Sequence, residues 1–322
     1  MGITVRPLSP FGVEVIGLDL EDEKTLDADT QKLLRNIWVE HGIVLFRNAL
    51  HSEAAHMRLS RVFGEPEPSA VKRINEESNP YLMALRQKPG DDSSSMFALF
   101  EVDGQERAGW LTWHWDQSFM PEIVRGALLR MLEPARIDGR TGYIDAIAAY
   151  DRLPEKTKQR IEGLEVVYQF TGAQERNPFG LPKSLRIVRQ HPQRDETQEQ
   201  FKRDFPPVVH PLVITQRETG RKVLKLSPMH CQYILGMDKS ESDALLQELA
   251  EHLVDPRYAY FHTWQADDAI VWDNWRVIHC VTGVPFDVAR YGQRTTIMGD
   301  YKLGRYLNAD QYENRPTARF ND

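Results

Sequence analysis

At 322 residues and 41% hydrophobic composition, the chain has enough apolar material for one large β domain or two smaller ones. Its formal net charge of −7 argues against a non-specific nucleic-acid binder, because such proteins need a basic face to displace counterions from phosphates. Two cysteines, Cys231 and Cys280, without paired spacing exclude a disulfide scaffold and a cysteine-based zinc module. No apolar run resembles a signal segment or a membrane span, so we expect no membrane partner and a cytoplasmic protein.

Residues 13–64 predict a strand, a helix, a strand and a second helix. Residues 13–20 alternate loosely, as in a strand, and residues 43–46 are a short apolar run typical of a buried strand. Asp29 or Thr30 can cap the first helix, which would end at Gly42, and Ser52 can cap the second, which would end at Gly64.

Two later segments, residues 65–109 and 174–205, lose this periodicity and are rich in polar and charged residues. The first contains a stretch of Pro, Gly, Asp and Ser, residues 89–95, that is typical of a mobile loop. Long insertions in compact domains often cover active sites, whereas a charged run is also compatible with a solvated surface. We therefore expect two insertions and leave open whether they are active-site lids.

The remaining chain predicts many short strands and few helices. The expected strands are residues 127–132, 164–168, 209–215, 223–226, 258–264, 269–272, 277–281 and 294–299, and the expected helices begin at Pro154 and Ser240. Short strands in this number favour a mainly β fold with flanking helices and a double-stranded β-helix core, the jelly-roll or cupin-like barrel. No linker divides the chain, so we expect a single domain over residues 1–322.

His114 and Asp116 are the first candidates for metal ligands. Side chains two positions apart on an extended strand point to the same side, so this imidazole and this carboxylate would converge while Trp115 turns away. His279 lies in the apolar run 277–281, where a buried imidazole needs a hydrogen-bond partner or a metal. One more histidine from a distant strand, added to His114 and Asp116, would complete the two-histidine, one-carboxylate set of non-haem iron sites.

Arg290 and Arg294 stand four residues apart where an apolar strand begins. Buried guanidinium groups usually accompany an anion, because their fork of donors matches a carboxylate. Arg294 could instead make structural hydrogen bonds only.

Several blocks in order make the chain resemble the taurine dioxygenase (TauD/TfdA-like) family of Fe(II)/2-oxoglutarate-dependent dioxygenases. These blocks are Trp-His-x-Asp-x-x-Phe at 113–119, a Thr-containing turn at 138–141, His-Pro-Leu-Val at 210–213, Trp-Asp-Asn at 272–274 before the distal histidine, and the arginine pair before Ile-Met-Gly-Asp. The resemblance implies that His114, Asp116 and His279 bind Fe(II). It also implies that Arg290, assisted by Thr141, binds the distal carboxylate of 2-oxoglutarate. The family's usual Gly-Gly-Asp-Thr turn is here Asp-Gly-Arg-Thr.

The resemblance also suggests substrate contacts and an activity. Arg294 falls where some members bind an anionic substrate, and His230 falls where relatives have an aromatic pocket wall; the alternative for His230 is a bond to a backbone carbonyl, facing away. The expected enzyme uses Fe(II), 2-oxoglutarate and O2 to oxidise a small anionic organic substrate, releasing succinate and CO2. A metal-dependent hydrolase and a non-catalytic cupin-like binding protein are the alternatives, and a homo-oligomer is left open.

Overall fold

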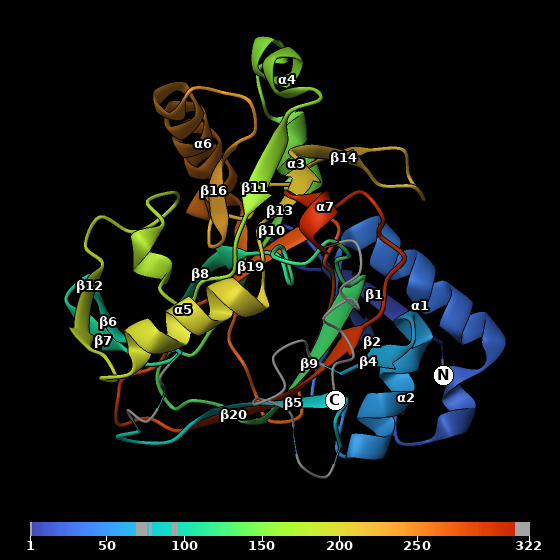
Figure 1. Ribbon diagram of the computed structural model, residues 1–322. Coiled ribbons are helices and arrows are strands. Elements are labelled where there is room, and N and C mark those ends of the chain that lie inside the picture. Colours follow the sequence, from blue (N-terminus) through green and yellow to red (C-terminus); the bar gives the residue numbers. More distant parts are fainter. Residues whose placement is uncertain (1, 69–75, 77–78, 92–93, 95, 313–322) are drawn as a thin grey trace.

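The computed structural model describes residues 2–68, 76, 79–91, 94 and 96–312 and shows a mainly β fold with two facing sheets (Figure 1). In the described chain the larger sheet has eight strands. Its order is β1 (Thr4–Pro7), β2 (Val13–Ile16), β3 (Ile43–Phe46), β18 (Ala269–Asp273), β9 (Gly126–Glu133), β20 (Arg290–Ile297) and β4 (Pro66–Glu67), with β5 (Leu82–Gln87) also paired to β20.

The second sheet carries most of the candidate site. Its strands are β17 (Ala259–His262), β10 (Thr141–Asp145), β19 (Val277–Val281) and β8 (Leu111–His114), in that spatial order and paired antiparallel. Apolar side chains from both sheets, among them Leu129, Tyr143, Ile270 and Trp272, form one buried cluster between them. The two sheets around a shared core confirm the predicted jelly-roll.

Smaller sheets and helices complete the fold. The remaining strands are β16 (Cys231–Ile234), β11 (Glu165–Tyr168), β13 (Val208–Pro211) and β21 (Arg305–Tyr306) in one sheet, β12 (Arg186–Arg189), β6 (Leu99–Val102) and β7 (Gln105–Arg107) in another, and the hairpin β14 (Val213–Thr215) and β15 (Lys222–Leu224). The α-helices are α1 (Ala28–His41), α2 (Glu53–Phe63), α3 (Ala146–Asp151), α4 (Glu155–Ile161), α5 (Arg194–Asp204), α6 (Lys239–Leu253) and α7 (Ala309–Tyr312).

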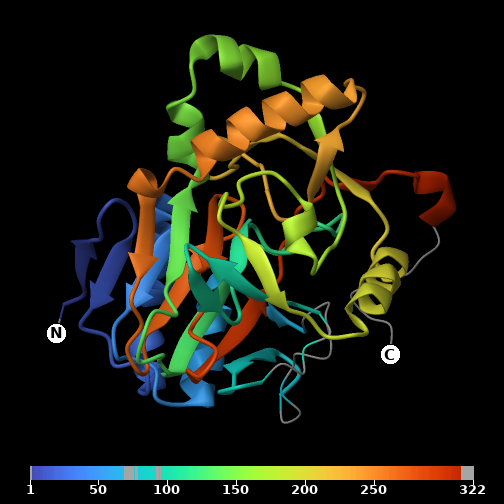
Figure 2. The ribbon, with the colours of Figure 1, turned by 90° about the vertical axis from the view of Figure 1, so that its left-hand side faces the viewer.

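Helices α1 and α2 pack on the outer face of the larger sheet, while α4 and α6 lie at the far end of the molecule (Figures 1 and 2). The cap of α1 is Asp27, whose carboxylate accepts the N–H of Thr30 at 2.8 Å, so the expected caps Asp29 and Thr30 were wrong. Ser52 does cap α2, as expected. Ser240 does not cap α6, which begins after Asp238 without a side-chain cap bond. The described part of the chain contains no helix long and apolar enough to cross a membrane.

The two segments expected as insertions contain regular structure. Residues 65–109 include β4, β5, β6 and β7. Strand β5 pairs along its whole length with β20, so β5 belongs to the larger sheet. Residues 174–205 include β12 and α5. Of the loop expected at 89–95, residues 92, 93 and 95 lie outside the described residues.

Candidate active site

His114 and His279 are neighbours across a strand pair. His114 ends β8 and lies opposite His279 of β19 in the antiparallel register, and the centroids of their rings are 4.2 Å apart. Side chains of directly opposed residues share one face of a sheet. The fold therefore brings together two histidines that are far apart in the sequence.

Asp116 lies beyond the end of β8, in the turn that follows, so the expectation that strand alternation places it beside His114 was wrong. The turn nevertheless directs its carboxylate to the same point. Asp116 Oδ1 is 4.0 Å from His114 Nε2 and 3.7 Å from His279 Nε2. All three side chains are buried, and one ligand atom from each lies within 4.8 Å of the others. No other group of three possible ligands occurs in the described residues.

The protonation of this cluster suits a metal ion. His114 Nδ1 donates to the carbonyl of Thr112 at 2.8 Å, which leaves Nε2 as the lone-pair atom that faces Asp116. Burial lowers the pKa of His114 and of His279, so both imidazoles stay neutral. Burial alone raises the pKa of Asp116, but the charge of Arg294, which also donates to the carboxylate, outweighs burial and holds the pKa at about 2. Two neutral imidazoles and one carboxylate are the donor set that fits non-haem Fe(II).

Arg294 contacts the metal-site carboxylate directly. Its Nη2 lies 2.6 Å from Asp116 Oδ2, and the indole N–H of Trp272 donates to the same oxygen at 3.3 Å. The guanidinium carbon lies 5.0 Å from the centre of the Trp272 ring. Oδ2 is thus occupied by two donors, and Oδ1 is left to face the two imidazoles.

Arg290 has a different environment. Its Nε donates to the carbonyl of Gly139 at 3.3 Å, but its buried Nη2 has no hydrogen-bond partner among the described residues. Burial lowers the pKa of Arg290 to about 10. A buried guanidinium with an unused donor fits an anionic ligand such as the distal carboxylate of 2-oxoglutarate.

Thr141 is the remaining candidate for 2-oxoglutarate binding, and a cavity adjoins Arg290. Thr141 begins β10, and its hydroxyl accepts the indole N–H of Trp264 at 2.9 Å, which leaves its own hydrogen free to donate. A cavity of about 430 Å³ includes Arg290 in its lining, together with residues from both segments expected as insertions, such as Phe97 and His191.

His230 is buried in an aromatic cluster. Its ring stacks on Phe170 at 5.3 Å and meets the edge of Phe119 at 5.2 Å. Its Nδ1 accepts the backbone N–H of Thr171 at 3.3 Å, so the proton must sit on Nε2. Burial lowers the pKa of His230 to about 3, so it offers a neutral donor. The expected alternative, a bond from His230 to a backbone carbonyl, does not occur at this nitrogen.

A sequence model of the family described as "Taurine catabolism dioxygenase TauD, TfdA family" matches residues 4–297, which is most of the chain. The chain belongs to the TauD/TfdA family. It is an alpha-ketoglutarate-dependent dioxygenase, of the class that uses Fe(II), 2-oxoglutarate and O2. This confirms the resemblance seen in the sequence and disfavours the hydrolase and the binding protein.

Individual relatives match over nearly the whole fold. The (S)-phenoxypropionate/alpha-ketoglutarate-dioxygenase of Sphingobium herbicidovorans is 28% identical, with 92% of this chain and 95% of that protein covered. An alkylsulfatase of Acinetobacter baylyi is 27% identical, with 92% and 84% covered. The crystal structure of AAD-2 in complex with Mn(II) and N-oxalylglycine has a TM-score of 0.72 at 26% identity, and the match covers 94% of this chain and 100% of that chain.

Sequence reasoning missed three residues around the TauD/TfdA site. Trp272 lies near the end of β18 and Asn274 lies in the turn after it, and both contact Asp116, whereas the sequence indicated only a strand and a turn here. Tyr143 stacks on His279 with ring centroids 6.3 Å apart, and its buried hydroxyl has no partner in the described structure. The signal available for Tyr143 was its place two residues after Thr141, on the same face of β10.

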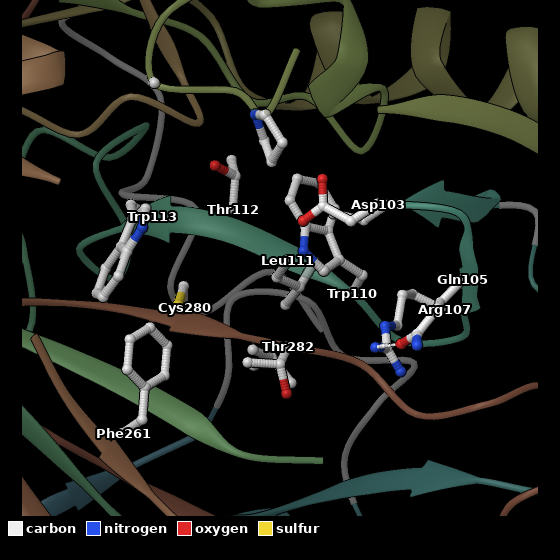
Figure 3. A pocket seen from close by; sticks show the side chains of 14 residues that line it. Asp103, Gln105, Arg107, Trp110, Leu111, Thr112, Trp113, Phe261, Cys280 and Thr282 are labelled. Atoms are coloured by element: carbon white, nitrogen blue, oxygen red, sulfur yellow. Dashed lines mark hydrogen bonds between the residues drawn. The ribbon is translucent and has the colours of Figure 1, made fainter. Parts of the chain in front are cut away.

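A second cavity, of about 370 Å³, lies on the other face of the β8–β19 pair. Trp113 and Cys280 line it, and each is the immediate neighbour of a site histidine, so strand alternation turns them away from the site. Figure 3 shows Trp113, Cys280 and Phe261 at one end of this cavity and Arg107 with Gln105 at the other. The sheet separates this cavity from the His114, Asp116 and His279 cluster.

Proposed function

We propose that His114, Asp116 and His279 bind Fe(II), that Arg290 and Thr141 bind 2-oxoglutarate, and that the enzyme oxidises a small organic anion. The observation that carries this proposal is the buried three-donor cluster, with a buried guanidinium nearby on β20 that keeps an unused donor. When bound, Fe(II) and 2-oxoglutarate supply the redox chemistry that activates O2, with succinate and CO2 as co-products.

The protein's contribution is geometry. The register of β8 and β19 fixes the two imidazoles, and the bond from His114 Nδ1 to Thr112 directs Nε2 inward. Arg294 and Trp272 hold Asp116 Oδ2, so that the carboxylate offers one oxygen to the metal. These three protein donors would hold Fe(II) and would leave room on it for 2-oxoglutarate and O2.

Recognition of 2-oxoglutarate rests on charge. The guanidinium of Arg290 and the hydroxyl of Thr141 offer donors to a carboxylate, and such charge-assisted hydrogen bonds are stronger than neutral ones. Arg290 is buried, and the lower effective dielectric at a buried position strengthens the attraction further.

The substrate pocket combines apolar and cationic features. Phe119, Phe170 and Phe205 form an aromatic group with His230, whose Nε2–H can donate to a polar substrate atom. Arg294 keeps a buried Nε without a partner in the described structure. These features favour an anion with an apolar body, which is the chemistry named for the phenoxypropionate and alkyl sulfate relatives.

We also propose that the parts of segments 65–109 and 174–205 outside the larger sheet act as lids, because Phe97 from one and His191 from the other line the cavity that contains Arg290. The buried free thiols of Cys231 and Cys280 are compatible with a reducing compartment such as the cytoplasm.

The test is succinate formation by the purified protein with Fe(II), 2-oxoglutarate and a panel of aryloxy acids, alkyl sulfates and sulfonates, each beside its neutral ester or alcohol. We expect at least one anion to stimulate succinate release well above the rate without substrate. A product formed without 2-oxoglutarate would indicate a hydrolase, and binding without any succinate would indicate a binding protein; either result would overturn the proposal.

A further inference from the structure

Asp116 is not held by a strand. Because β8 ends at His114, the backbone of Asp116 makes no ladder bonds to β19, and the next residue, Gln117, has a left-handed φ of 58°. Residues other than glycine adopt this region infrequently. The position of the carboxylate therefore depends on contacts made by other parts of the chain.

One side chain supplies both of the missing backbone bonds. Asn274 Oδ1 accepts the N–H of Asp116 at 2.7 Å, and Asn274 Nδ2 donates to the carbonyl of Asp116 at 3.1 Å. This is the pair of bonds that a facing residue of a neighbouring strand would make. Nδ2 also donates to the carbonyl of Val124 at 3.1 Å, so the amide plane is fixed from a third direction.

Asn274 is itself held by a buried lysine. Lys225 Nζ donates to the carbonyl of Asn274 at 2.5 Å, and the ammonium lies 4.1 Å from the centre of the Trp115 ring. Both Lys225 and Asn274 are almost completely shielded from solvent. Burial holds the pKa of Lys225 well below its usual value, although the nearby carboxylates of Asp273 and Asp116 raise it. Burying an amine costs free energy, and an apolar side chain could fill the same space without that cost. The specific contribution of Lys225 is therefore its hydrogen bond to the carbonyl of Asn274.

We propose that Asn274 is a positioning residue for the metal-binding carboxylate of Asp116, and that Lys225 acts through Asn274. The inference rests on the proposed function, since it assumes that Asp116 binds the metal. It goes further in assigning the geometry of that ligand to a side chain 158 positions away in the sequence.

The test uses binding of Mn(II), measured by calorimetry on the full chain without O2. Removing a partner that orients a metal ligand typically weakens metal binding by about 10- to 100-fold, and we expect this loss for Asn274→Ala. Lys225→Met should weaken binding in the same direction, by about tenfold or less. Because Lys225 acts through Asn274, the double variant should bind Mn(II) no more weakly than Asn274→Ala alone, whereas additive losses would overturn the pathway.

Gln174 offers a matched control for general loosening of β8. Its buried amide also accepts a backbone N–H of this region, that of Thr112 at 2.8 Å, and donates to the carbonyl of Trp110 at 2.9 Å. Gln174→Ala should lower the melting temperature about as much as Asn274→Ala but change Mn(II) affinity much less. Equal loss of Mn(II) affinity in the two variants, or unchanged affinity in a folded Asn274→Ala, would overturn the proposal.

A second readout separates positioning from stability. The folded Asn274→Ala protein, saturated with Fe(II) and supplied with ascorbate as the reductant for turnovers that oxidise no substrate, should release more succinate per molecule of oxidised substrate than the wild type, because a displaced Asp116 misaligns the site. An unchanged ratio would contradict a positioning role. If the wild type itself bound no Mn(II), the proposed function would fail first, so the two failures are distinguishable.

Discussion

Replacing Arg290 with methionine should separate function from stability. The side chain is 8% exposed, its Nη2 has no partner among the described residues, and burial lowers its pKa to about 10. Since each pKa unit corresponds to about 1.4 kcal/mol, keeping this group charged costs roughly 3 kcal/mol in the free protein. Methionine fills similar space without that cost, so Arg290→Met should leave the free energy of unfolding unchanged or raise it.

The same substitution should weaken 2-oxoglutarate binding. A hydrogen bond to a charged group contributes about 1.5–3 kcal/mol, which corresponds to roughly a ten- to hundredfold loss of affinity. We expect the KM for 2-oxoglutarate to rise by this factor, while the KM for the organic substrate changes little. Thermal unfolding with and without 2-oxoglutarate gives an independent reading, because a ligand stabilises only the state that binds it.

Arg276 is the matched control. It is also buried, but it makes two bonds to the carboxylate of Asp145, at 2.9 and 2.7 Å. Breaking such a pair typically costs about 3–5 kcal/mol, so Arg276→Met should destabilise the protein where Arg290→Met does not. Equal destabilisation by both substitutions, or an unchanged affinity of Arg290→Met for 2-oxoglutarate, would refute the assignment of Arg290 to the anion.

Three further predictions follow from the site and the core. Arg294→Gln should weaken Mn(II) binding, because it frees Asp116 Oδ2, and should reduce the preference for the anionic substrate over its neutral ester; an unchanged preference would remove Arg294 from the substrate site. His230→Phe keeps the aromatic stacking but deletes the Nε2–H donor, so the KM of the organic substrate should rise, and an unaltered KM would assign His230 to the scaffold alone. Burial lowers the pKa values of His56, His210 and His230 to about 3, so the unfolded chain binds more protons than the folded one once the pH falls below about 6.5. The stability that these histidines contribute is full above that pH, and the free energy of unfolding should decline by roughly 1 kcal/mol per histidine between pH 7.5 and 5.5. Urea unfolding at the two pH values would measure this decline.

Residue patterns with a local cause were predictable from the sequence. The apolar runs of β3, β18 and β19 needed only their composition, and Ser52 was recognisable as a helix cap from its own position. The convergence of His114 with Asp116 was also expected, although the reason was different: a turn, and not the pleat of a strand, presents the carboxylate.

Features that depend on distant partners were not predictable in this way. Strand β5 lacks a clear alternation, and it is a strand because its backbone pairs with β20, about 200 residues later. The role of Asn274 depends on contacts with Asp116 and Lys225, which are far from it in the sequence and adjacent only after the two sheets have packed. The helix α1 begins at Asp27 because that carboxylate reaches the N–H of Thr30, a choice among several acidic residues that sequence alone does not rank.

The most direct test of the account is an anaerobic titration of the wild type and of His114→Ala, Asp116→Ala and His279→Ala with Fe(II), followed by measurement of succinate after 2-oxoglutarate, O2 and the best substrate are added. The account predicts one tightly bound Fe(II) per wild-type chain and succinate in proportion to substrate oxidised. It predicts neither stoichiometric iron nor turnover in the three variants, each folded as judged by its melting curve. Wild-type succinate formation by Asp116→Ala would contradict the assignment of the site.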